Sequence, residues 1–188
     1  MRVIETAIPG VLVVEPKKHG DERGFFSETF KASALAAHGV THGWRQDNHS
    51  FSGRKGVVRG LHFQAPPQAQ AKLLRVTRGA ILDVAVDIRC GSPTFGRHVA
   101  VELSAANWRQ LYVPVGMAHG FCTLEVDTEV LYKTSEEYAP ETERGLHWLD
   151  PALAIAWPIS AAEATVNVRD QAWPNLTNTS SPFSCDEV

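Results

Sequence analysis

Apolar and polar residues alternate along most of the chain in short runs, and turn residues separate one run from the next. In the clearest run, 80–88, four aliphatic residues fall on one face of a strand, while Asp83 and Asp87 fall on the other. The runs predicted as strands are 11–15, 24–30, 44–51, 57–63, 72–77, 80–88, 97–103, 110–113, 120–124 and 129–134. Many short strands at this spacing predict an all-β antiparallel sandwich or barrel, with a jelly roll among the leading options.

Helical signals are few. The alanine-rich segment 31–38 is followed by Gly39, a residue typical of the position just after a helix, and 160–163 is predicted to form a short helical turn. No repeat or linker divides the chain, so we expect a single domain over residues 1–188. From about residue 177 the sequence is rich in Ser, Thr, Asn and Pro, which predicts a flexible tail.

Composition narrows the classes of function. With 44% hydrophobic and 21% charged residues, the 188-residue chain is typical of globular proteins. The net charge of −3 provides no basic field for nucleic acid. No apolar run approaches the ~20 residues that a membrane span needs, and the N-terminus lacks the apolar segment of a signal peptide. The three cysteines show no metal or redox spacing, so we expect a reduced, cytoplasmic protein.

The run GVVRGLHFQ, residues 56–64, places an arginine and a histidine in an otherwise strand-like segment. Arg59 implies an anion or a carboxylate nearby, and the neutral-range pKa typical of histidine suits His62 to exchange protons. Regular alternation would send the two side chains to opposite faces, but a bulge at Gly60 could turn both the same way. Taken alone, the run favours a structural strand with a core histidine and a surface arginine.

Four further polar residues are candidates for chemistry. Lys72 shares a strand face with aliphatic residues, and His119 lies between Gly116 and Gly120. Each has a structural alternative, because a lysine can place its ammonium in water and a lone histidine is often structural. Tyr132, on an alternating strand, can be a packing residue, and Asp170 next to Arg169 can be half of a solvated ion pair. The sequence itself leaves these alternatives open.

A metal site is weakly supported. Metal-dependent barrels of the cupin type generally carry two histidines two residues apart on one strand. This chain has eight histidines, but no two of them have that spacing. His38 and His42 are four apart, but Gly39 interrupts the helix that would align them. We therefore expect no bound metal.

The whole chain, from about residue 2 to residue 176, resembles the dTDP-4-dehydrorhamnose 3,5-epimerases. Seven strings occur in the expected order: DERGFFSETF (21–30), QDNHS (46–50), GVVRGLHFQ (56–64), DVAVDIRCGSPTFG (83–96), VPVGMAHGF (113–121), YKTSEEYAPETERGLHW (132–148) and DPALAIAWP (150–158). The resemblance implies a cupin-like jelly-roll barrel with few short helices. It also implies a homodimeric isomerase that needs no metal or organic cofactor.

The resemblance further implies a substrate and residue roles. The substrate is dTDP-4-keto-6-deoxyglucose, inverted at carbons 3 and 5, which flank the ketone. His62 would be the base, Tyr132 the acid and Asp170 the residue that orients His62, with Lys72 beside the ketone. The implied nucleotide contacts are Arg23, Glu28, Gln46, Asp47, Asn48, Arg59, His119, Tyr138, Glu143 and Arg169. Of these, Tyr138 would stack on thymine, and Arg169 stands where the family usually has lysine.

Three alternatives remain at this point. An epimerase that inverts only one of the two carbons would use the same catalytic residues. A metal-dependent cupin enzyme would lose activity in chelator. A non-catalytic sugar-nucleotide-binding protein would have no turnover to lose when His62 is replaced.

Overall fold

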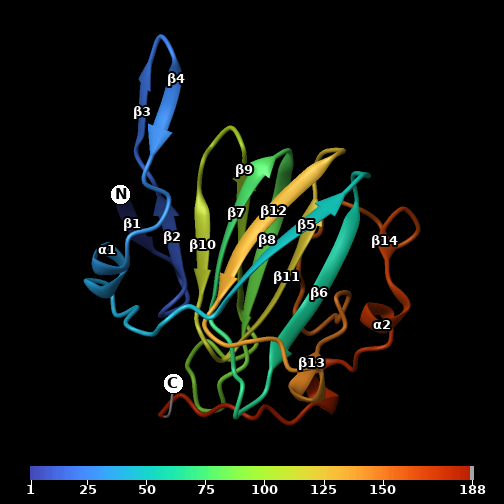
Figure 1. The fold of residues 1–188 in the computed structure, drawn as a ribbon. Coiled ribbons are helices and arrows are strands. Elements are labelled where there is room, and N and C mark those ends of the chain that lie inside the picture. Colours follow the sequence, from blue (N-terminus) through green and yellow to red (C-terminus); the bar gives the residue numbers. More distant parts are fainter. Residues whose placement is uncertain (187–188) are drawn as a thin grey trace.

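The computed structural model describes residues 1–186, and its strands form two facing six-stranded sheets (Figure 1). The first sheet has the order β1 (Arg2–Glu5), β2 (Leu12–Glu15), β10 (Gln110–Val113), β7 (Lys72–Arg78), β12 (Thr128–Thr134), β5 (Gln46–Ser52). The second has the order β13 (Glu143–Gly145), β6 (Val57–Gln64), β11 (Met117–Thr123), β8 (Ala80–Asp87), β9 (His98–Ser104), and β14 (Thr165–Val166) pairs with β6. Every pairing except that of β14 is antiparallel, and the predicted jelly-roll class is confirmed.

Each run predicted as a strand overlaps a strand of the structure. The run 24–30 is shortened to β4 (Gly24–Ser27), which pairs with β3 (Lys18–Asp21), and the run 120–124 begins earlier, as β11. The predicted helix is α1 (Ala32–Ala36), and residues 160–163 form a hydrogen-bonded turn. Besides two 3-10 helices, η1 (Pro140–Thr142) and η2 (Leu176–Asn178), five elements of the described residues were not predicted from the sequence: β1, β3, β13, β14 and the short α2 (Val168–Gln171). The last three are too short for a periodic signal.

The core fills the space between the sheets. Leu74 and Val130 from the first sheet meet Ile81 and Phe121 from the second, and all four are nearly inaccessible to solvent. The outer face of β8 is covered as well, because C-terminal segments pack over it. Both faces of this strand are therefore buried.

The C-terminal segment differs from the expected flexible tail. After the short 3-10 helix η2 (Leu176–Asn178), Phe183 is 4% exposed, and its ring packs edge-on against Phe63 at 5.8 Å between centroids. Cys90 also forms a β-bridge with Ser184. This part of the predicted tail is docked because it covers apolar side chains of the second sheet. Residues 187–188 lie outside the described part of the chain.

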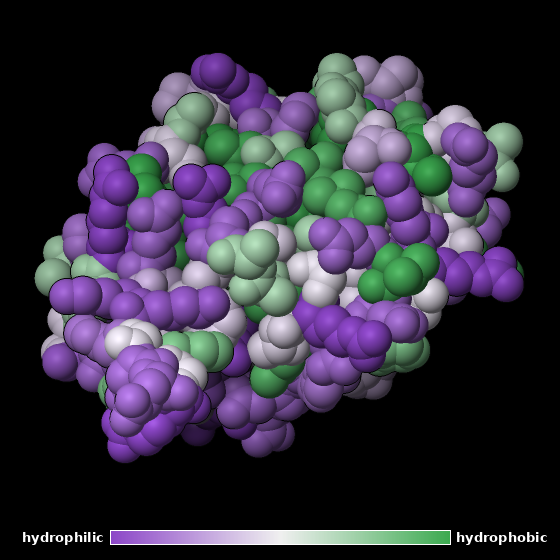
Figure 2. All heavy atoms as spheres, turned by 90° about the horizontal axis from the view of Figure 1, so that it is seen from above, coloured by the Kyte–Doolittle hydropathy of each residue, from purple (hydrophilic) through white to green (hydrophobic). Residues whose placement is uncertain are grey.

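The hairpin of β3 and β4 projects away from the barrel (Figure 1). Two aromatic side chains on it are exposed, Phe25 by 59% and Phe26 by 72%. Figure 2 looks at the molecule from this end and shows apolar side chains at the surface among polar ones. The hairpin thus presents apolar surface that the rest of this chain does not cover.

The strand β6 breaks its alternation at Gly60, as the sequence requires if Arg59 and His62 serve one site. His62 pairs with His119, but Arg59 pairs with Phe121, so one extra residue is accommodated on β6. Gly60 has a φ of +112°, in the region that favours glycine. The bulge turns both side chains toward the interior between the sheets.

Gly60→Ala is therefore expected to destabilise the fold. An added Cβ would lie 2.6 Å from the backbone of Gly120 and 2.6 Å from the carbonyl oxygen of His119. Strain at positive φ and overpacking together predict a loss of about 3–5 kcal/mol in the free energy of unfolding. Gly43→Ala is the matched control, because its added Cβ meets nothing within 4 Å. Equal melting temperatures for the two variants would contradict the close backbone packing described at Gly60.

Candidate active site

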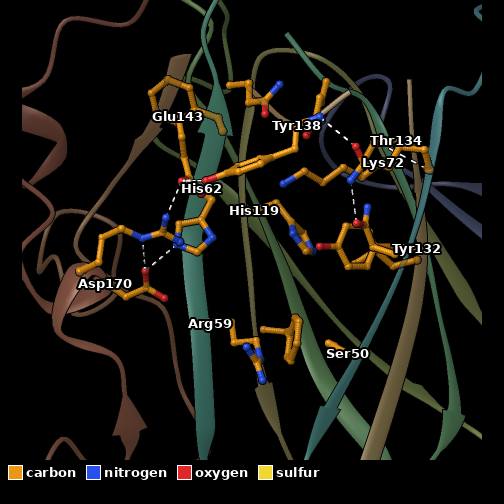
Figure 3. Close-up of a pocket in the computed structure, with 18 of the residues that line it drawn as sticks. Ser50, Arg59, His62, Lys72, His119, Tyr132, Thr134, Tyr138, Glu143 and Asp170 are labelled. Atoms are coloured by element: carbon orange, nitrogen blue, oxygen red, sulfur yellow. Dashed lines mark hydrogen bonds and ion pairs between the residues drawn. The ribbon is translucent and has the colours of Figure 1, made fainter. Parts of the chain in front are cut away.

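A cavity of about 370 Å³ lies between the two sheets (Figure 3). Its wall includes residues of β5, β6, β7, β11, β12 and β13, together with α2. Eleven of the residues predicted from the sequence line it: Gln46, Asn48, Arg59, His62, Lys72, His119, Tyr132, Tyr138, Glu143, Arg169 and Asp170. Residues far apart in the sequence thus meet in one site.

His62 and Asp170 form a close pair. Nε2 of His62 lies 2.6 Å from Oδ1 of Asp170, whose side chain is fully buried. The short helix α2 presents this carboxylate, and Asn167 caps the helix by accepting the N–H of Asp170 at 2.7 Å. The interpretation of Asp170 as half of a solvated ion pair is therefore wrong.

The carboxylate of Asp170 is held in its charged form. Burial raises its pKa, but hydrogen bonds from His62 and from the N–H of Gly60, with the charge of Arg169, outweigh burial and lower the pKa. A carboxylate can only accept from the ring, so neutral His62 donates Nε2–H to it. Nδ1 then carries the lone pair that can take a proton.

Lys72 comes from the first sheet and lines the same cavity. Burial lowers its pKa to about 8, while the charges of Glu143 and Asp83 act in the opposite direction. The ammonium is thus charged at neutral pH but loses its proton in mildly alkaline solution. Lys72 is half-buried and lines the cavity, which does not fit the alternative of a strand-edge lysine with its ammonium in bulk water.

Tyr132 also comes from the first sheet, on β12, and in Figure 3 it lies across the cavity from His62. Burial raises the pKa of its hydroxyl, so the group keeps its proton at neutral pH. The cavity therefore has a proton acceptor on one wall and a proton donor on the other.

Polar side chains bridge one side of the cavity. The hydroxyl of Tyr138 donates to Oε2 of Glu143 at 2.7 Å, and Arg169 donates to the same oxygen. The side-chain oxygen of Gln46 accepts the backbone N–H of Tyr138 at 2.9 Å. Arg59 donates to the carbonyl oxygen of Phe51 at 3.2 Å. Two guanidinium groups and an exposed aromatic ring are thus available to a ligand here.

Three predicted contacts lie outside this cavity. Asp47 points to the other face of β5, where its carboxylate accepts from Lys133 at 2.8 Å, because neighbours on a strand face opposite ways. Arg23 pairs with Asp21 at the turn of the projecting hairpin. Glu28 is exposed and lies 3.8 Å from Lys31. This chain's own cavity receives none of these three side chains.

Several polar residues of the wall were not predicted from the sequence. Ser50, Gln64, Gln70, Thr134 and Asn167 also line the cavity. The alternation of β5, in which Gln46 and Asn48 face inward, extends naturally to Ser50, so that residue had a detectable signal. The same alternation extends from His62 to Gln64 on β6 and from Tyr132 to Thr134 on β12. Gln70 and Asn167 lie outside the strands and had no such signal.

Two classes of site can be checked within residues 1–186. No group of three or more His, Cys, Asp and Glu side chains in this range is arranged to hold a metal ion. Nor does any helix of this described range have the length and apolar character to cross a membrane.

The fold and the cavity define a cupin-like acid–base enzyme. The family model described as dTDP-4-dehydrorhamnose 3,5-epimerase matches residues 5–178. The dTDP-4-dehydrorhamnose 3,5-epimerase of Shigella flexneri is 53% identical over 160 residues, 85% of this chain and 88% of the relative. The chain therefore belongs to the dTDP-4-dehydrorhamnose 3,5-epimerase family, and its predicted enzyme class, an isomerase, is confirmed.

Solved structures agree with this placement. The Legionella pneumophila dTDP-6-deoxy-D-glucose-3,5-epimerase, in complex with dTDP-4-keto-L-rhamnose, is 46% identical, with a TM-score of 0.90 over 95% of this chain and 94% of that one. ChmJ, a 3'-monoepimerase from Streptomyces bikiniensis in complex with dTDP-quinovose, is 37% identical, with a TM-score of 0.85 over 92% of this chain and 86% of ChmJ. The same fold thus accompanies both double and single epimerisation.

Proposed function

We propose that this enzyme inverts carbons 3 and 5 of dTDP-4-keto-6-deoxyglucose to give dTDP-4-keto-rhamnose, without a metal or an organic cofactor. The observation that carries the proposal is the placement of His62 and Tyr132 on opposite walls of one cavity. Inversion at a carbon next to a ketone requires proton removal from one face and proton delivery to the other. Two walls provide those two faces.

His62 begins each inversion. Nδ1 takes the proton from the carbon beside the ketone, and the electron pair of the C–H bond moves to the ketone oxygen, giving an enolate. Asp170 fixes the ring and stabilises the imidazolium that forms. Positioned acid–base catalysis contributes about 10²–10⁴-fold, so the enolate needs further stabilisation.

Lys72 provides that stabilisation. Its ammonium places a fixed positive charge in a largely buried site, where charge acts more strongly than in water. Tyr132 then delivers a proton to the opposite face of the carbon, and the enolate returns to the ketone. The tyrosinate is re-protonated and His62 deprotonated by exchange with solvent before the next turn.

Tyr132→Phe is expected to keep proton removal and lose inversion at one carbon at least. His62 still removes and returns a proton from its own face, so deuterium from solvent enters the sugar without a change of configuration. Proton NMR in deuterated water on dTDP-4-keto-6-deoxyglucose measures both events. Epimerisation by this variant at the wild-type rate would show that Tyr132 is not the acid.

The remaining residues of the cavity suit the nucleotide. Arg59 and Arg169 match the geometry of a diphosphate. The exposed ring of Tyr138 can stack on thymine, and Gln46, Asn48 and Glu143 can accept from base or ribose donors. His119 borders the same space. Because Arg169 now holds Glu143, diphosphate binding would exchange one anionic partner of this guanidinium for another.

Arg23 and Glu28 fit this scheme in a homodimer. Both belong to the projecting N-terminal segment, whose Phe25 and Phe26 are exposed in the single chain. An exchange of N-terminal segments between two subunits would bury these rings and carry Arg23 and Glu28 to the partner's cavity. Light scattering of the purified protein tests the dimer, which we place in the cytoplasm.

A second candidate is a single-site epimerase of the same substrate class, because the ChmJ fold matches this chain closely. Proton NMR in deuterated water separates the two by counting the ring positions that exchange. The proposed function expects deuterium at carbons 3 and 5 and a product of inverted configuration at both. Exchange at one carbon alone favours the second candidate, and no exchange overturns both.

A further inference from the structure

The cavity contains a second histidine–aspartate pair for which the mechanism above has no use. Nε2 of His119 lies 2.6 Å from Oδ1 of Asp83. His119 is 7% exposed and borders the cavity, whereas Asp83 is fully buried behind it on the adjoining strand β8. A buried carboxylate is costly, so a pair of this kind requires an explanation beyond packing.

The second pair lies beside the first. His119 on β11 is the cross-strand partner of His62 on β6. Their carboxylates come from different places, Asp170 from α2 and Asp83 from β8. The two imidazoles therefore enter the cavity as neighbours on one wall, each held from behind by its own carboxylate.

Hydrogen-bond chemistry determines which tautomer His119 adopts. Burial lowers the pKa of His119 more than the charge of Asp83 raises it, so the ring is neutral near pH 7. A carboxylate can only accept, so the single ring proton lies on Nε2 and points at Asp83. Nδ1 is then left without a proton and can only accept from a neighbouring donor.

Lys72 lines the same cavity as His119, and its charge interacts with both members of this pair. The charge of Asp83 raises the pKa of Lys72 against burial, and the charge of Lys72 lowers the pKa of His119. Oδ2 of Asp83 has no hydrogen-bond partner within residues 1–186, so much of its charge is left to act at a distance. The other ionisable groups that line the cavity with Lys72 are Glu143 of β13, His62 and Arg59 of β6, Tyr132 of β12, Arg169 and Asp170 of α2, and Tyr138.

We propose that Asp83 is a positioning residue for the reaction: it holds His119 with Nδ1 as an acceptor and, through this pair and its own charge, keeps the Lys72 ammonium protonated at the ketone. In the opposite tautomer, Nδ1–H would add the positive end of a dipole to the cavity that holds the Lys72 ammonium, and would disfavour the charged form of that lysine. The two His–Asp pairs thus have different tasks. One accepts the substrate's proton, and the other maintains the cation that stabilises the enolate.

This inference rests on the proposed function for the role of Lys72, but two of its tests need no turnover. In the wild-type protein, ¹⁵N NMR of the imidazoles is expected to show the Nε2–H tautomer for His119. A proton on Nδ1 would overturn the proposal without any variant. The second test is an NMR titration of the Lys72 side chain, whose signal is assigned by its absence from the spectrum of the Lys72→Met variant.

Asp83→Asn keeps an acceptor for Nε2–H but removes the charge. We expect the titration of Lys72 to move about one pH unit lower, and the alkaline fall of kcat to move with it, while KM changes less than about threefold. Asp87→Asn is the matched control, because Asp87 is equally buried on the same strand but pairs with Arg89. An unchanged Lys72 titration in Asp83→Asn, or an equal shift in the control, overturns the proposal.

Asp83→Leu removes both the charge and the acceptor. It is expected to lower kcat by about 10–100-fold even below pH 7, where Lys72 is charged in either protein. Binding of dTDP, measured by calorimetry, checks that the cavity is intact. Wild-type kcat at low pH in the Asp83→Leu variant contradicts the tautomer role. If the wild type fails to turn over the sugar nucleotide, the proposed function fails, while the NMR readings still decide this inference.

Discussion

His62→Ala is expected to lower kcat by about 10³–10⁴-fold and to abolish deuterium exchange at both carbons. The reason is that Asp170 stabilises the cation that forms when His62 takes the proton. The second pair, His119 with Asp83, does not replace it, because burial lowers the pKa of His119 and makes that ring a weaker base. Both inversions start with proton removal, so both are lost together. Proton NMR in deuterated water measures exchange, and coupled assays measure turnover.

The control for this variant is His49→Ala. His49 lies on β5 but faces outward, where its ring pairs with Glu129 at the surface. The His49→Ala variant should therefore keep wild-type turnover. Binding of dTDP should remain within about threefold in both variants, because neither ring is proposed to hold the nucleotide. Residual exchange within about tenfold of wild type in His62→Ala would refute the base assignment.

Lys72→Met is expected to lower kcat by about 10²–10³-fold, the usual effect of removing one group that stabilises a developing oxyanion. The charge also predicts a pH dependence. Because burial lowers the pKa of Lys72 to about 8, the wild-type rate should fall as the pH rises above that value. The sign follows from the chemistry, since lysine is charged only below its pKa.

Lys72→Arg separates charge from residue identity. A guanidinium stays protonated throughout the accessible pH range, so the fall above about pH 8 should disappear even if the rate is reduced by altered geometry. Lys133→Met is the control on the outer face, where Lys133 pairs with Asp47, and its pH profile should match the wild type. A fall in the same pH range that persists in Lys72→Arg would assign that titration to another group.

In the proposed mechanism, the catalytic base and the cation at the ketone depend on separate carboxylates. Asp170 accepts from His62, whereas Asp83 accepts from His119 and is proposed to act on Lys72. This division gives a physical reason for the placement of two buried carboxylates in a site that must also admit a sugar diphosphate. In each pair the imidazole lies between the carboxylate and the cavity, so the negative charge does not face the ligand directly.

The strands and most of the cavity residues could be predicted from the sequence. Alternation is a local property, so the pattern around Val84 and Val86 is sufficient to identify β8. The demand for a bulge at Gly60 was equally local, because Arg59 and His62 could share a site in no other way. The docking of Phe183 was not predictable, because a polar segment around it conceals one buried ring.

By itself the sequence determined the all-β class, the run of strands and the family, because these depend on residues close together in the chain and on strings in a fixed order. The family resemblance implied Asp170 as the partner of His62, but only the tertiary structure showed that pair in contact and revealed Asp83 as the partner of His119. Asp170 is 108 residues from His62, and Asp83 is 36 from His119, so neither pair has a local signature. Their burial, and with it the pKa of Lys72, depends on how the two sheets close around the cavity, which is a property of the whole chain.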